Sequence, residues 1–266
     1  MSRKDMVQTM IHKANYHTHT TRCKHANGTD QEYVLAAIEA GYDELAFTDH
    51  TPWQLFPNEN GYNRMSISEM GDYVASIRHL STQYSEKISI KLGVEAEYYR
   101  DRFDWLMDLK KKYNLDLLVL GNHFRGYEST TTYYGNYKDK TNLYKHYVED
   151  AIDAMATGEY KIFAHPDIFF RTINVVNSLA VDATQQICEA ANHYGVALEY
   201  NLGGVRYGDH SYPKPEFWEV VAKNKNIAII GVDAHSPANL LDHETRKQAK
   251  IYLNKLGVNL VEKLDL

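Results

Sequence analysis

Seven short runs of β-branched and apolar residues alternate with stretches of helical period along the chain, and this alternation constrains the fold more than any other feature. Such spacing is typical of βα units around a parallel sheet. Segments 117–120 and 227–230 are continuously apolar, as in strands that are covered on both faces. A parallel barrel is therefore expected, with strands at Ala14–His19, Glu44–His50, Ile88–Tyr98, Leu117–Phe124, Lys161–Asp167, Val196–Asn201 and Ile227–His235. Helices are expected at Asp30–Ala40, Ser68–Tyr84, Asp101–Tyr113, Thr141–Thr157, Leu179–Tyr194, Pro215–Lys223 and Ala238–Leu256.

The composition fits one globular domain over residues 1–266. Hydrophobic residues make up 44% of the chain and charged residues 24%, with 6 prolines, which excludes a disordered or collagen-like chain. No internal repeat or linker-like composition marks a second domain. No apolar run approaches the roughly 18 residues of a membrane span, and the first residues lead into no signal-like apolar core.

The net charge and the cysteine content limit which binding partners and which cellular compartment are expected. The net charge of -6 gives no basic footprint for a nucleic acid or an anionic membrane, so an anionic substrate must be held by local charge. The two cysteines, Cys23 and Cys188, lie far apart in the sequence and are too few for a disulfide framework. A cytoplasmic location is therefore expected, and no feature of the sequence indicates an oligomeric state.

Histidines gather where the predicted strands end. Of the 13 histidines, seven lie at or just beyond such an end, and two carboxylates, Glu95 and Asp233, join them. Side chains two apart on a strand point to the same side, so His17 and His19 can share one metal ion. The long loops 51–65, 125–138 and 203–213 follow strands on the same face, where barrels build their active sites. The seven histidines are His17, His19, His25, His50, His123, His165 and His235.

A metal centre explains this cluster better than a buried core does. A single histidine is most often a hydrogen-bonded structural residue, but seven imidazoles beside two carboxylates would be costly to bury without a compensating cation. Imidazole and carboxylate suit zinc, manganese or iron, and zinc is favoured by affinity order. Nine ligands exceed the three or four that one catalytic zinc takes, so more than one ion is expected. The spacing alone does not assign ligands to ions.

These residues resemble the polymerase and histidinol phosphatase (PHP) superfamily of metal-dependent phosphoesterases over nearly the whole length. The family's motifs are found here as His17-Thr18-His19 with His25, as Thr48-Asp49-His50, and then as Glu95, His123, His165 and Asp233-Ala234-His235. Segments 23–28, 47–52, 93–98 and 199–206 look most like stand-alone histidinol-phosphate phosphatases. The resemblance implies a distorted (β/α)7 barrel that hydrolyses L-histidinol phosphate to L-histidinol and phosphate, in histidine biosynthesis, through attack by a hydroxide that bridges two metals.

The resemblance also implies three divalent ions and their ligands. One ion would take His17, His19, Glu95 and Asp233. A second would take Glu95, His123 and His165, so that Glu95 bridges the two. A third would take His25, His50 and His235. Zinc is expected, with manganese or iron as alternatives.

Four further residues are candidates for catalysis and substrate binding. Asp49 would either give a proton to the leaving alkoxide or orient a ligand imidazole. Arg171 and Arg206 each follow a predicted strand and would fork onto phosphate oxygens. Glu97 would meet the cationic amine of the substrate or support a metal ligand.

Several alternatives stay open. Another PHP activity, on phosphotyrosine proteins or nucleotides, is the nearest, although the sequence shows no basic groove for a nucleic acid. An amidohydrolase barrel also opens with His-x-His, but it usually bridges its metals from the fourth strand, where this chain offers His123. A non-enzymatic metal store would need neither open coordination positions nor arginines on the same face.

Overall fold

The computed structural model describes residues 13–53, 63–128, 130–137, 139–173, 175–208 and 212–266. Within these ranges the chain forms one parallel sheet whose strands follow one another in chain order. The strands are β1 (Ala14–Asn15), β2 (Glu44–Phe47), β3 (Ser89–Ala96), β4 (Leu117–Leu120), β5 (Tyr160–Phe163), β6 (Ala197–Asn201), β7 (Ile227–Gly231) and β8 (Asn259–Leu260).

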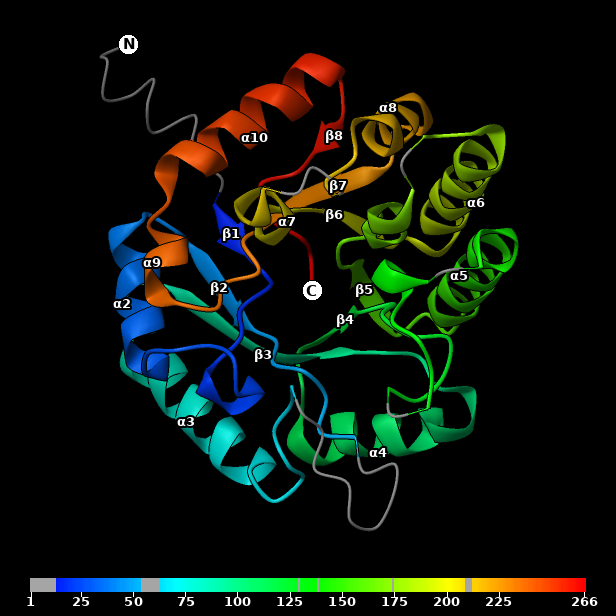
Figure 1. Cartoon of the computed structure of the whole chain (residues 1–266). Helices are drawn as coiled ribbons and strands as arrows, with labels where there is room; N and C mark the ends of the chain where they lie inside the picture. Colours follow the sequence, from blue (N-terminus) through cyan, green and yellow to red (C-terminus); the bar gives the residue numbers. More distant parts are fainter. Residues whose placement is uncertain (1–12, 54–62, 129, 138, 174, 209–211) are drawn as a thin grey trace.

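The helices surround the curled sheet, so the strands form an inner ring (Figure 1). Longer helices connect successive strands, and short ones lie near the ring's mouth. The helices are α2 (Asp30–Glu39), α3 (Met70–Gln83), α4 (Phe103–Tyr113), α5 (Lys140–Ala156), α6 (Ser178–Tyr194), α7 (Leu202–Tyr207), α8 (Pro215–Asn224), α9 (Pro237–Leu240) and α10 (His243–Leu256). Single 3-10 turns are η1 (Thr21–Cys23), η2 (Arg100–Arg102), η3 (Tyr134–Asn136) and η4 (Ile168–Thr172).

The seven predicted strands and the α/β barrel class are confirmed, although six of the seven strands end two to four residues earlier than predicted. Three further differences concern the order of the elements. An eighth strand, β8, pairs with β7, and its two residues are too few to give a periodic pattern. The segment expected as a loop at 203–213 begins with α7, whose first turn is capped by the Asn201 side chain. The last predicted helix is split into α9 and α10, because Asp242 caps a new helix through the backbone N–H of Thr245.

The sheet closes near the carboxyl ends of its strands. Residues after β1 pair with residues after β7, with the His19 backbone N–H donating to Ala234 O at 2.9 Å and the Ala234 N–H donating to His17 O at 3.2 Å. These two segments are more than 200 residues apart in sequence, and their pairing brings both ends of the motif set to one place. Among the described residues, no helix has the length and apolar character to cross a bilayer.

The barrel interior is filled at its opposite end. Small and apolar side chains from the strands form an inner cluster, and Val261 and Leu264 of the C-terminal tail pack against it. The Leu264 backbone N–H donates to the Tyr16 hydroxyl at 2.9 Å, and this hydroxyl donates to Glu44 at 2.7 Å. The chain end thus lies inside the ring of strands (Figure 1), and the carboxyl ends of the strands remain for a site.

Candidate metal centre

Eight of the nine predicted ligands line one cavity of about 250 Å³ at the carboxyl ends of the strands. The ninth, His17, is only 1% exposed and lies against the other ligands. Aromatic and basic side chains complete the wall. The cavity is lined by His19, His25, His50, Glu95, His123, His165, Asp233 and His235, together with Tyr133, Ile168, Arg171, Tyr207 and Tyr212.

The first group of ligand atoms has the spacing of a tetrahedral site. His17 Nε2 and His19 Nε2 lie 3.0 Å apart, and each is 3.3 to 3.5 Å from Glu95 Oε2 and from Asp233 Oδ1. Four ligands at about 2.0 Å from a zinc ion would be about 3.3 Å from one another. Glu95 Oε2 and Asp233 Oδ1 are buried without a hydrogen-bond partner in the described structure. These four atoms therefore fit one divalent ion.

A second group uses the other oxygen of Glu95. Glu95 Oε1 lies 3.0 Å from His165 Nε2 and 3.2 Å from His123 Nε2, and the two imidazole nitrogens are 3.3 Å apart. Three ligands with open space beside them are the arrangement of a catalytic metal site. The geometry thus allows Glu95 to bridge two ions.

The third group is less evenly spaced. His25 Nε2 and His235 Nε2 lie 2.9 Å apart, with ring centroids of His25 and His50 at 5.8 Å. His50 Nδ1 is buried without a hydrogen-bond partner among described residues and lies 3.0 Å from Glu95 Oε2. His50 therefore lies between Glu95 and the other two histidines of the third group, His25 and His235.

Cys23 is near His19 and His235, but burial raises the pKa of its thiol to about 12, which disfavours a thiolate ligand.

Carboxylates behind the imidazoles hold their orientation. Glu199 faces His17 Nδ1 at 2.9 Å, and Glu97 faces His123 Nδ1 at 3.0 Å. An acceptor on one ring nitrogen fixes the tautomer and leaves the other nitrogen free for a metal. No role was predicted for Glu199, which lies two residues before the end of β6.

Glycines make room for these contacts. A Cβ on Gly231 would lie 2.0 Å from Glu199 Oε1, and a Cβ on Gly121 would lie 2.7 Å from Glu95 Oε1. Gly231 belongs to β7, between β6 and the extension of β1 in the closed sheet. Because this position has no side chain, the Glu199 carboxylate can reach past β7 to His17.

Substitution of Glu199 tests this arrangement. We expect Glu199→Gln to weaken metal binding at the His17 position by about 10- to 100-fold, because the amide offers a weaker acceptor for the His17 Nδ1 proton. The affinity is measured by competition with a coloured chelator. Glu149→Gln, an exposed carboxylate away from the cavity, serves as the control and should leave the affinity unchanged.

Asp49 lies behind a ligand and does not line the described cavity. It is fully buried, it accepts hydrogen bonds from the backbone N–H and hydroxyl of Thr20, and its Oδ1 lies 3.8 Å from His19 Nδ1. Burial raises its pKa to about 7. Asp49 thus faces the His19 imidazole from beyond hydrogen-bond distance, and its place outside the cavity disfavours proton transfer to a leaving group.

Glu97 also lies outside the lining of the metal cavity. It is 2% exposed and binds Arg64 at 3.1 Å, His123 and the Trp53 indole N–H at 2.8 Å. Burial alone would raise the pKa of Glu97, but the Arg64 guanidinium and His123 outweigh it and hold the pKa well below its usual range. Its carboxylate therefore supports His123 and is not available to a substrate amine.

The two predicted phosphate arginines occupy different positions. Arg171 lines the metal cavity, and its guanidinium lies over the Tyr133 ring at 5.9 Å. Arg206 is outside the lining, and one of its terminal nitrogens donates to the backbone oxygens of Val232 and Asp233 at 2.7 and 2.8 Å. Asp233 has a left-handed backbone, with φ of 50°. Arg206 therefore stabilises the turn that presents Asp233.

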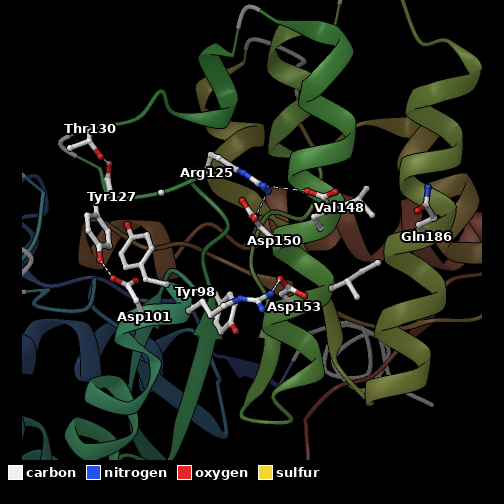
Figure 2. Close-up of a pocket in the computed structure, with 14 residues that line it drawn as sticks. Tyr98, Asp101, Arg125, Tyr127, Thr130, Val148, Asp150, Asp153 and Gln186 are labelled. Carbon is white, nitrogen blue, oxygen red and sulfur yellow. Dashed lines mark hydrogen bonds and ion pairs between the residues drawn. The ribbon is translucent and has the colours of Figure 1, made fainter.

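A larger cavity of about 800 Å³ lies on the outside of the barrel, beside α5 (Figure 2). Its charged side chains are paired with one another. Arg125 bonds Asp150 at 2.7 Å, and Tyr127 donates to Asp101. Among the described residues, the candidate metal groups all lie in the barrel mouth. The outer cavity therefore has no part in the chemistry of the metal centre.

The PHP domain family matches residues 15–202, more than half of the chain. The chain belongs to the PHP domain family. A relative from Schizosaccharomyces pombe named "Probable histidinol-phosphatase" is 27% identical over 268 residues, which cover 91% of this chain and 86% of the relative. One from Deinococcus radiodurans, with the same name, is 25% identical over 229 residues, 84% of this chain and 86% of the relative.

Solved PHP structures share the fold. The histidinol phosphate phosphatase of Lactococcus lactis, solved with zinc, L-histidinol and phosphate, superimposes with a TM-score of 0.72 at 19% identity. The match covers 96% of this chain and 99% of the other. At this identity the likeness establishes the architecture, and the chemistry of this chain rests on its own residues.

Proposed function

We propose that this PHP protein is a metal-dependent histidinol-phosphatase, which hydrolyses L-histidinol phosphate to L-histidinol and phosphate. The observation that carries the proposal is one buried carboxylate, Glu95, whose two oxygens each belong to a different ligand group in a single cavity. The names of the relatives support the substrate. The runner-up is another PHP phosphoesterase, acting on phosphotyrosine proteins or nucleotides.

The ligands would hold three divalent ions, with zinc as the first choice. The first would take His17, His19, Glu95 and Asp233, the second Glu95, His123 and His165, and the third His25, His50 and His235. Bound there, such ions would ionise water near neutral pH and neutralise the charge of the phosphate. The unpartnered buried oxygens of Glu95 and Asp233 support this assignment.

The chain's own side chains would position the ester. Arg171, on the wall of the cavity, presents a guanidinium that can donate two parallel hydrogen bonds to phosphate oxygens. Arg206 supports the Asp233 turn through one terminal nitrogen, and a phosphate contact through its remaining nitrogens stays a prediction. A small-molecule substrate is supported by the size of the cavity. The expected absence of nucleic-acid partners and the cytoplasmic location also stay predictions.

A substrate panel tests the proposal. With zinc present, we expect kcat/KM for L-histidinol phosphate to exceed that for a phosphotyrosyl peptide and for a dinucleotide by at least about 100-fold, because the cavity is compact. Phosphate release and nucleotide release are measured under the same conditions. Equal rates on all three compounds would reject the substrate assignment, and turnover of none would favour a metal store.

A further inference from the structure

The metal cavity continues into a second lobe. A space of about 370 Å³ adjoins the cavity of about 250 Å³, and the two share His25, His50, His123 and Tyr133. The rings of Phe124 and Tyr133 form an aromatic wall, with centroids 5.7 Å apart. A molecule whose phosphate lies in the metal cavity can therefore extend its other end into this lobe.

Glu128 brings a carboxylate to the second lobe through a buried ion pair. The Arg64 side chain, 4% exposed, donates to Glu128 Oε2 at 2.6 Å and to Glu97 Oε1 at 3.1 Å. A further nitrogen of Arg64 donates to Thr51 O at 2.9 Å. Arg64 thus has its nitrogens engaged on the protein, and it fixes the orientation of Glu128.

The charges in this network do not balance. When His123 is a neutral metal ligand, two carboxylates, Glu97 and Glu128, face one guanidinium, which leaves one negative charge. Glu97 also receives the His123 and Trp53 hydrogen bonds, and it is buried. Glu128 keeps about a fifth of its side chain exposed (22%), and no described residue donates to its Oε1. The uncompensated charge is therefore presented by Glu128 Oε1, in the second lobe.

We propose that Glu128 binds the protonated amine of the substrate, as the residue that selects amine-bearing phosphate monoesters. This rests on the proposed function, because L-histidinol phosphate carries its ammonium group on the middle carbon of the chain that joins the phosphate to the imidazole ring. The metal cavity, once it holds ions, would attract the phosphate together with Arg171, and Glu128 would attract the ammonium group. Among the acidic residues described, Glu128 is the one that lines this lobe.

A pair of substrates isolates this contact. L-Histidinol phosphate is compared with 3-(imidazol-4-yl)propyl phosphate, which has the same ring and phosphate but no amine. We expect Glu128→Gln to lower kcat/KM for the amine substrate by about 10- to 100-fold, mainly through KM, because a charge-assisted hydrogen bond is lost. For the analogue without the amine, we expect a change of less than about threefold.

Two further variants and the wild type complete the design. Glu128→Asp keeps the charge and should restore part of the preference for the amine substrate. Glu149→Gln removes an exposed carboxylate from the outer cavity and should leave kcat/KM unchanged for both substrates. An equal loss on both substrates, or no loss on the amine substrate, would overturn the inference while the proposed function stands. A wild-type enzyme that does not hydrolyse L-histidinol phosphate would overturn both.

Discussion

Replacing Glu95 with glutamine is expected to empty two metal positions at once and to lower kcat/KM for L-histidinol phosphate by at least about 1,000-fold. Glu95 is 1% exposed, and its Oε2 and Oε1 lie in different ligand groups. The amide has one oxygen and no charge, so it cannot serve both positions. The measurements are metal content by mass spectrometry and steady-state kinetics at saturating zinc.

The matched control for this variant is Glu149→Gln, which removes a carboxylate of the same size from the outer face of α5. It should retain full metal content and activity. If Glu95→Gln lost a single ion, Glu95 would not be a bridge. If it retained its full complement of ions with full activity, the assignment of the ligand groups would be wrong.

Stripping the protein of divalent ions is expected to abolish phosphatase activity and to make the protein take up protons at pH 7. Burial lowers the pKa of the His17 imidazole, but the three carboxylates that face it outweigh burial and raise the pKa well above its usual value. In the same way, Glu95 and Glu97 raise the pKa of His123 to about 10. Without metal, both imidazoles are therefore protonated at neutral pH, whereas a metal ligand must be neutral.

The sign of the pH dependence follows from these shifts. The metal positions that contain His17 and His123 each displace about one proton when they bind an ion. The apparent affinity of each position for metal should therefore rise about tenfold per pH unit between pH 6 and 8. Proton uptake on chelation is followed with an indicator dye in weak buffer, and affinity by chelator competition at several pH values. Full activity after exhaustive chelation, or an affinity independent of pH, would contradict the metal centre as described.

The barrel and the convergence of the ligands could be predicted from sequence because parallel strands end on the same face. Residues that follow strands, such as His17, His50 and Asp233, must then lie around one mouth, whatever their separation along the chain. Strand ends are local features, and the short apolar runs before them mark their positions. Helical periodicity is also a local feature, and the predicted helix bounds are therefore close to the observed ones.

The residues that support the metal ligands, such as Glu97 and Glu199, could not be assigned from sequence. Their roles depend on which side chains contact one another in the folded protein. Glu97 shares a strand end with Glu95, but its side chain contacts Arg64 and His123 instead of the cavity. Glu199 reaches His17 across 182 positions of sequence, and only the closed sheet and the missing side chain at Gly231 allow that contact. Strand β8 has two residues, and its existence depends on pairing with β7.

The carboxylate of Glu95, divided between neighbouring ligand groups, has a consequence for how the centre fills. An ion at one position would fix the side-chain rotamer of Glu95, and the adjacent position requires the same rotamer. The pair should therefore saturate cooperatively as zinc is supplied, with half-filled molecules scarce throughout the titration. An enzyme built in this way would switch between an inert and a competent state over a narrow range of free metal.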